Sequence, residues 1–180
     1  MKKPLINCLA ILVVALVLFA SCKHIKPTEF KEIEVNGLFS MQLPVYLHPT
    51  TDLMPFTSTN FHQYQDSVGK VCLLIFDTSR ANIDIPDLKT FYDTMVSKTV
   101  LDSAQITPAK LIMIDNDSVY RSEIAGIHNG IWIFSEVETI ATKDRFYNIV
   151  TWSSFDRREK LRDDMIKMLN SFHDINHVKK

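Results

Sequence analysis

The chain has 180 residues, of which 46% are hydrophobic and 23% charged, and its formal net charge is −1. These values are typical of a single globular domain. The near-neutral charge argues against a nucleic acid partner, which requires a concentrated basic face, and four glycines leave little material for a Gly-rich phosphate-binding loop.

Residues 1–21 have the pattern of a secretory signal peptide. Two lysines precede an apolar run, residues 9–20, that is shorter than the ~20 apolar residues of a membrane-spanning helix. The motif Phe19-Ala20-Ser21-Cys22 resembles the bacterial lipobox, which implies that Cys22 is lipidated and becomes the first mature residue. Phe19 departs from the Leu that is more frequent at the first lipobox position. The alternative is an ordinary signal peptide followed by an unmodified cysteine.

Lipidation would attach the protein to a membrane of the bacterial cell envelope, with residues 22–30 forming the lipidated Cys22 and a tether. No acidic run of the kind associated with surface export follows Cys22, so we expect the domain to face the periplasm. Cys8 leaves with the signal peptide, which leaves Cys72 without a partner for an intramolecular disulfide. The core is therefore expected to hold the fold without a disulfide.

Residues 31–173 are predicted to form one α+β domain, followed by a polar tail at residues 174–180. The domain opens with a hairpin around Asn36-Gly37, because a type I′ turn needs positive φ at both central residues. A Pro-rich loop leads to two further strands, residues 59–65 and 71–76. The second is apolar throughout, which predicts a central strand covered on both faces. In that strand Cys72 is predicted to be a small buried residue, since no activating base lies near it in the sequence.

Two helices complete the predicted domain. The first, residues 86–101, is indicated by apolar residues at helical spacing and by Pro86 in its first turn. The second follows Ser154 and buries an apolar stripe. Short polar turns separate the strands predicted between the helices, which are residues 111–114, 119–127, 131–141 and 146–153. We predict a central, mostly antiparallel sheet of about six to eight strands with helices covering both faces, an α/β/α sandwich.

The sequence contains no catalytic motif of the HExxH, GxSxG, Walker or CxxC type. Glu123, Glu136 and Glu138 lie on predicted strands, where they either face one cleft or form the solvent face of the sheet. His62 could meet Glu123 or Glu136 across the sheet, although an isolated surface histidine is the preferred interpretation. We therefore predict a protein without enzymatic activity and without a cofactor.

The segment Asp115-Asn116-Asp117-Ser118 carries the alternating side-chain oxygens that bind calcium. A calcium loop also needs a central glycine and a final bidentate Glu, where this chain has Tyr120 and Gly126. A hairpin turn explains these residues better, because Asn and Asp tolerate turn conformations. No metal site is predicted.

The loop at residues 46–61 is the predicted interaction site. It concentrates five apolar side chains among the prolines at positions 44, 49 and 55, and aromatic anchors often dominate binding energy. These residues are Tyr46, Leu47, Leu53, Met54 and Phe56. The simpler alternative is a flap whose aromatic residues pack on the sheet, and of the two interpretations we favour the flap.

The order of predicted elements resembles the PsbP-like fold, which is shared by the extrinsic photosystem II protein and a Ran-binding nuclear import factor. The resemblance is carried by Phe39–Pro44, Ile85–Leu88, Tyr120–Gly126 with Ile131–Phe134, and Ser171-Phe172. The layout is also similar to that of small bacterial lipoproteins of unknown role. The resemblance implies a fold, and no photosystem-binding or Ran-binding residues match, so neither activity is carried over.

Three functions follow as hypotheses. The first is a non-catalytic, lipid-anchored accessory or binding protein of the envelope, whose partner would be another envelope protein. The second is an envelope hydrolase with a site built from scattered Glu and His residues, and the third is a small-ligand carrier with the 46–61 loop as a lid. Convergent titratable groups in a pocket would favour the enzyme, a deep apolar pocket under the loop the carrier, and a flat apolar patch a protein partner.

Overall fold

The computed structural model describes residues 27–54, 58–98 and 101–175. The predicted signal peptide, the lipobox with Cys22, and Phe56 of the predicted interaction loop lie outside these residues. The strands are β1 (Phe30–Val35), β2 (Phe39–Pro44), β3 (His48–Pro49), β4 (Phe61–Gln65), β5 (Val71–Ser79), β6 (Asp102–Ile106), β7 (Lys110–Ile114), β8 (Asp117–His128), β9 (Ile131–Ala141), β10 (Arg145–Ser154) and β11 (His173–Asp174). The helices are α2 (Leu88–Ser97) and α3 (Arg158–Asn170), with short 3₁₀ turns η1 (Arg80–Asn82) and η2 (Phe155–Arg157).

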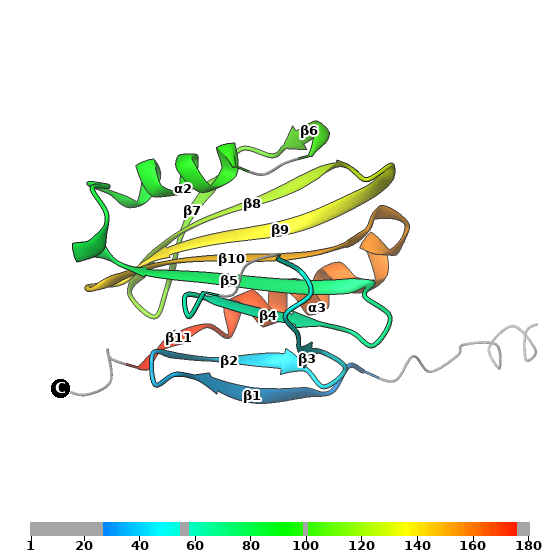
Figure 1. Ribbon diagram of the computed structural model, residues 1–180, viewed down its shortest axis with the longest axis horizontal. Helices are drawn as coiled ribbons and strands as arrows, with labels where there is room; N and C mark the ends of the chain where they lie inside the picture. The colour runs from blue at the N-terminus through cyan, green and yellow to red at the C-terminus, as the bar shows by residue number, and fades with distance from the viewer. Residues whose placement is uncertain (1–26, 55–57, 99–100, 176–180) are drawn as a thin grey trace, which may run out of the picture.

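The strands form two sheets (Figure 1). The large sheet has eight strands in the order β3-β4-β5-β10-β9-β8-β6, and β7 pairs with the same strand, β8, as β6 does. All of its pairings are antiparallel. The small sheet has the order β1-β2-β11, so the last strand of the described chain pairs with the second. The predicted α+β class and the mostly antiparallel sheet are therefore confirmed.

The core divides into two clusters, and β10 contributes to both because its side chains alternate. Phe146 packs with Leu88 and Phe91 of α2, and the ring centroids of Phe91 and Phe146 are 4.7 Å apart. The next residue, Tyr147, belongs to the larger cluster, which joins α3, β2 and the large sheet. Phe172 packs there between Phe39 and Tyr147, with centroid distances of 5.4 and 4.9 Å.

The described residues contain two α-helices, and β2 shares the cover of the larger cluster with α3. This is less helix than an α/β/α sandwich contains. The layering that we predicted, with helices covering both faces, is accordingly not established. Part of the cover over the large sheet comes from the small sheet. Its buried residues Phe39, Met41 and Leu43 pack in the same cluster as α3.

Three hairpin turns have two consecutive residues with positive φ, as type I′ turns require. They are Asn36-Gly37, Asp115-Asn116 and Asn129-Gly130. The last two connect directly paired strands, since Ile114 faces Asp117 and His128 faces Ile131. The hairpin interpretation of these segments is confirmed.

Several boundaries differ from prediction. Helix α2 begins at Leu88 rather than Pro86, because the Asp87 side chain caps it by accepting a hydrogen bond from the Thr90 backbone N–H at 2.8 Å. The segment after α2, for which no strand was predicted, contains strand β6. Gly126 of β8 admits this strand, since a Cβ there would lie 3.2 Å from the Ala104 Cα and from the Asp102 backbone oxygen.

Candidate functional site

The described part of the predicted interaction loop is anchored to the domain. Leu47 is fully buried in the larger core cluster, and Tyr46 packs against that cluster. The backbone N–H groups of Leu53 and Met54 both donate to the Gln63 side-chain oxygen, at 3.1 and 3.0 Å. Leu47 is thus unavailable to a partner, and these contacts favour the packed flap.

The three strand glutamates, in contrast, gather on one face of the large sheet. Register pairs Glu123 of β8 with Glu136 of β9, and Arg121 of β8 with Glu138 of β9. They do not form a solvent face, because Glu136 is 2% exposed and Glu138 is 0% exposed. Neither arrangement left open by the sequence holds for all three residues, because Glu123 and Glu136 line one cavity whereas Glu138 is fully buried and does not.

Three arginines hold these carboxylates. From α3, Arg158 donates to both oxygens of Glu123, with Nη2 to Oε2 at 2.7 Å and Nε to Oε1 at 3.1 Å. Arg162 bridges two glutamates, since its Nε lies 3.1 Å from Oε2 of Glu123 and 3.0 Å from Oε1 of Glu136. From β8, Arg121 donates its Nε to Oε2 of Glu138 at 2.7 Å. The ion pairs therefore connect the sheet to the first two turns of α3.

Burial and pairing act in opposite directions on the three carboxyl groups. Burial raises the pKa of Glu138 to about 7, because the loss of water outweighs the attraction of Arg121. Burial likewise raises the pKa of Glu136 to about 6 despite Arg162. For the more exposed Glu123, burial is outweighed by the hydrogen bonds from Arg158 and Arg162, and its pKa is lowered.

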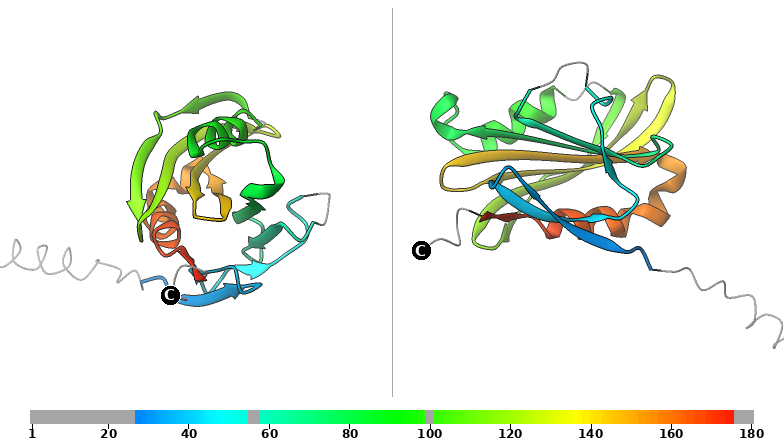
Figure 2. Two further views of the ribbon diagram at one scale, coloured as in Figure 1. Left: turned by 90° about the vertical axis from the view of Figure 1, so that its left-hand side faces the viewer. Right: turned by 60° about the horizontal axis from the view of Figure 1, so that its bottom comes forward.

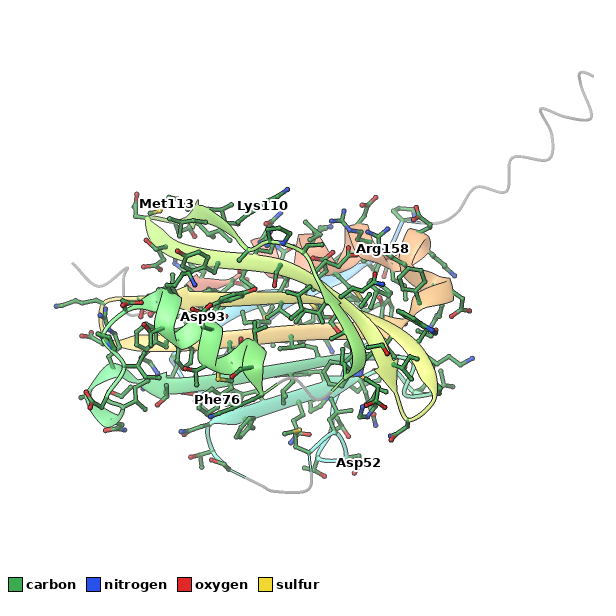
Figure 3. All side chains as sticks on the ribbon, turned by 90° about the horizontal axis from the view of Figure 1, so that it is seen from above. Asp52, Phe76, Asp93, Lys110, Met113 and Arg158 are labelled. Atoms are coloured by element: carbon green, nitrogen blue, oxygen red, sulfur yellow. The ribbon has the colours of Figure 1, made fainter. Side chains whose placement is uncertain are left out.

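A cavity of about 410 Å³ opens beside this cluster. One wall is the β6–β7 connection with Lys110, the floor is β8 and β9, and the other wall is α3 with Arg158 and Arg162. Figure 3 labels Lys110 and Arg158 on the two sides. Glu123 and Glu136 line this cavity, whereas the fully buried Glu138 does not. We call Glu123, Glu136, Arg121, Arg158 and Arg162 with this cavity the glutamate–arginine cleft.

The cleft can perform two kinds of chemistry. Its guanidinium and ammonium groups can bind an anionic or hydrogen-bonding ligand. A carboxyl with a pKa near 6, such as Glu136, can in principle exchange a proton near neutral pH. No histidine or cysteine lines the cleft, and Cys72 lies elsewhere in the domain, 5% exposed, with its pKa raised to about 11 chiefly by burial. The predicted burial of Cys72 is confirmed.

His62 does not reach the glutamates. Its Nε2 lies 3.5 Å from Oδ2 of Asp77, and the other oxygen of Asp77 is paired with Arg145. These bonds outweigh burial and lower the pKa of Asp77. The predicted isolated surface histidine is wrong, because the ring packs edge-on against Phe39 with centroids 5.7 Å apart.

Asp77 and Arg145 were not predicted as site residues. The available indication was Asp77 itself, a charged residue at the end of the apolar run of β5 where alternation directs it inward. Among the described residues no group of three or more His, Cys, Asp or Glu side chains is placed to hold a metal ion. A search of those residues also found no helix of the length and apolar character that crossing a bilayer requires.

Comparisons with known proteins show the fold. Neither a protein-family model nor a curated protein matches the sequence. The structure is similar to cyanobacterial PsbP (CyanoP) from Synechocystis, with 12% identity and a TM-score of 0.58 over 86% of this chain and 97% of that chain. It is similar to the Ran-binding protein Mog1p of Saccharomyces cerevisiae, with 12% identity and a TM-score of 0.57 over 83% of this chain and 97% of that one.

A third similar structure is LpqN of Mycobacterium tuberculosis, described as involved in cell envelope biogenesis. It is 10% identical, with a TM-score of 0.52 over 83% of this chain and 86% of that chain. At these identities the likeness concerns the fold alone. The chain has a PsbP-like fold, as its element order predicted.

Proposed function

We propose that this protein is a non-catalytic, lipid-anchored accessory or binding protein of the bacterial cell envelope. The lipobox-like motif ending at Cys22 supports the anchor. The PsbP-like fold supports an accessory role loosely, since one protein of that fold, LpqN, takes part in envelope biogenesis. The observation that carries the proposal is the pairing within the glutamate–arginine cleft.

In that cleft each carboxylate is already engaged by an arginine. A general base must be free to accept a proton from a substrate or water, and a nucleophile must be exposed to it. Glu138, whose pKa is raised most, is fully buried and does not line the cavity. The paired groups are better suited to fixing α3 on the sheet and to presenting Arg158 and Lys110 to a ligand.

The anchor is tested by expressing the full chain with its own signal sequence and analysing the membrane fraction by mass spectrometry. We expect a diacylglyceryl-cysteine at Cys22 and its loss in a Cys22→Ala variant. A mature N-terminus at any other residue would contradict the anchor. The binding role is tested by recovering proteins and small molecules that co-purify with the wild type, using the equally anchored Arg158→Gln variant as the matched control.

One observation favours an envelope hydrolase as a second candidate. Glu123 and Glu136 converge on one cavity, and the pKa of Glu136 is raised to about 6. A panel of ester, phosphate, glycoside and peptide substrates tests it with the wild type and Glu136→Gln. Turnover that the variant loses would establish the hydrolase, whereas turnover that it retains would exclude Glu136 as the acid or base.

The carrier hypothesis receives less support. The cavity that includes Tyr46 has a volume of about 500 Å³, but charged side chains form much of its lining. Asp66, Arg157 and Asp164 are among them. An apolar ligand needs a mostly apolar pocket, so this cavity does not support the carrier hypothesis.

A further inference from the structure

Five large apolar side chains are exposed at one end of the domain. They are Val45 (42% exposed), Val68 (65%), Ile131 (58%), Trp132 (44%) and Phe155 (44%), and we call them the apolar tip. The other exposed large apolar residues of the described chain are Ile106, Leu111 and Met113 on β6 and β7. Single exposed apolar residues are ordinary, but several at one end need an explanation.

Contacts between the elements bring Trp132, Phe155 and Val68 to one end of the domain. Trp132 begins β9 after the β8–β9 turn, and its ring meets that of Phe155 in η2 with centroids 6.1 Å apart. Val68 lies in the β4–β5 turn, which reaches the same end because Val71 pairs with Ser153, two residues before Phe155. Figures 1 and 2 show the β4–β5 turn, the β8–β9 turn and η2 at one end of the sheet.

The chain enters the domain at this same end. Pro27 and Thr28 line one cavity with Asp66 of the β4–β5 turn and Arg157 of η2. Thr28 donates a hydrogen bond to Asp164 of α3. Val45 of the apolar tip donates its backbone N–H to the Glu29 carbonyl at 3.0 Å. Thus the first described residues and the apolar tip share one end of the molecule.

Few residues separate the proposed anchor, Cys22, from the first described residue, Pro27. From Cys22 to Pro27 the chain has a span of at most about 18 Å when fully extended. A lipid on Cys22 would therefore hold the entry end, and no other end of the domain, close to the bilayer. The opposite end carries the Asp115-Asn116 turn, where Asp115 contacts His173 at 2.9 Å.

We propose that the apolar tip inserts into the lipid headgroup region, so that the domain docks on the membrane in one orientation. The proposal rests on the lipid anchor proposed above. Trp132 and Phe155 are suited to this region, since aromatic rings are enriched at membrane interfaces and Trp keeps a polar N–H for the wet side. The lipid surface, rather than a protein, is the occupant because the tether length brings it within reach.

Charges around the apolar tip are of both signs. Arg157 and Lys160 alternate with Asp156, Glu159 and Asp163 along η2 and α3, and Lys70 follows Asp66 in the β4–β5 turn. A balanced charge gives little net attraction to anionic lipid. We therefore expect insertion into zwitterionic and anionic vesicles to differ little. Docking by a polybasic surface would instead be much stronger on anionic vesicles, so the comparison distinguishes the two modes of binding.

The test uses the full-length lipidated protein in vesicles of phosphatidylcholine brominated on the acyl chain near the headgroup. The chain has two tryptophans, so Trp152→Phe leaves Trp132 as the reporter. We expect brominated lipid to quench Trp132 fluorescence, and Val68→Ser with Phe155→Ser to reduce that quenching. For the unlipidated chain from Lys23, the same double substitution should lower the vesicle partition coefficient at least about fivefold.

The matched control is Leu111→Ser with Met113→Ser, two residues 59% and 62% exposed on β7. In Figure 3 Met113 lies to the left of Arg158 along the domain. This control should leave quenching and partition unchanged. If Cys22 is shown by mass spectrometry to be lipidated and Trp132 fluorescence is the same in brominated and in ordinary lipid, the inference is overturned while the anchor stands.

Two further outcomes are informative. An unmodified Cys22 overturns the anchor. In that case, quenching of Trp132 fluorescence by added brominated vesicles shows whether the apolar tip inserts into lipid without an anchor. Self-association in solution that Trp132→Ser abolishes, without any vesicle binding, would assign the apolar tip to a second copy of the chain and overturn the lipid surface as its occupant.

Discussion

Arg121 on β8 faces Glu138 on β9 in one register pair, and its Nε donates to Oε2 of Glu138 at 2.7 Å. The Glu138 side chain is 0% exposed, whereas that of Arg121 is 16% exposed. The same guanidinium also donates to the Asn170 side-chain oxygen at 2.8 Å, near the end of α3. A fully buried carboxyl thus stands between the sheet and the helix that covers it.

This pair makes stability depend on pH. The pKa of Glu138 is about 7 in the folded protein and 4.5 ordinarily, so folding favours the protonated carboxyl. Its contribution is fully present below pH 4.5 and is lost as the pH rises through about 7. Between pH 5 and 8 the wild type should lose about 2.5 kcal/mol relative to Glu138→Gln, which stays neutral. Urea unfolding at several pH values measures this difference.

A matched control is Glu159→Gln, since Glu159 is 93% exposed and also lies beside an arginine. Its unfolding free energy should follow the wild type at every pH. Parallel pH profiles for the wild type and Glu138→Gln would show that Glu138 stays ionised in the folded protein.

Asp77 should behave in the opposite sense. Burial of Asp77 is outweighed by the nearby His62 ring and by the hydrogen bond from Arg145, which lower its pKa. Its contribution to stability is therefore present above the ordinary aspartate pKa and is lost as the pH falls through the folded value. At pH 7 we expect Asp77→Asn to cost about 2–3 kcal/mol of unfolding free energy, because Arg145 loses its partner. Asp93→Asn, which breaks an exposed pair with Lys89, should cost less than about 0.5 kcal/mol. Similar losses in both variants would contradict this assignment.

Cys72 should be unreactive in the folded protein. It is 5% exposed and burial raises its pKa to about 11, so little thiolate forms at neutral pH. Alkylation followed by peptide mass spectrometry should be at least about a hundredfold slower in buffer than in urea at the same pH. Comparable rates in the two conditions would place Cys72 at the surface.

The two possible roles of the loop at residues 46–61, an interaction site or a packed flap, are distinguished by measuring both stability and partner recovery. Leu47→Ala should lower the unfolding free energy by about 2–5 kcal/mol, because Leu47 is fully buried. Tyr46→Ala and Phe56→Ala are then compared with the wild type by thermal unfolding and by recovery of co-purifying proteins. Lost partners with unchanged melting would establish the interaction loop, whereas lower melting with partners retained establishes the flap.

Local rules predicted much of the fold. Asn36-Gly37 and Asn129-Gly130 gave hairpin turns because their positive φ values follow from residue type. Strands β5, β9 and β10 were found because their apolar runs are long. The helices were found from the spacing of residues such as Phe91 and Met165. The PsbP-like element order followed from these parts.

What escaped prediction depends on tertiary contacts. Strands β3 and β11 have two residues each, and their pairing partners lie elsewhere in the chain. That Glu136 and Glu138 face inward could not be decided, since alternation alone does not say which face is covered. His62 was assigned to the surface because its partner Asp77 is brought near by sheet pairing, which sequence spacing does not reveal.

The small sheet is completed by the end of the domain. Strand β11 pairs His173 with Ser40 and Asp174 with Phe39, and the neighbouring Phe172 covers the ring of Phe39. The free edge of β2 in the N-terminal hairpin can therefore pair with β11 only after nearly the whole chain has been made. Contacts between residues so far apart in the sequence form slowly. We expect chains that end before Phe172 to remain sensitive to protease, and chains that reach Ile175 to become resistant.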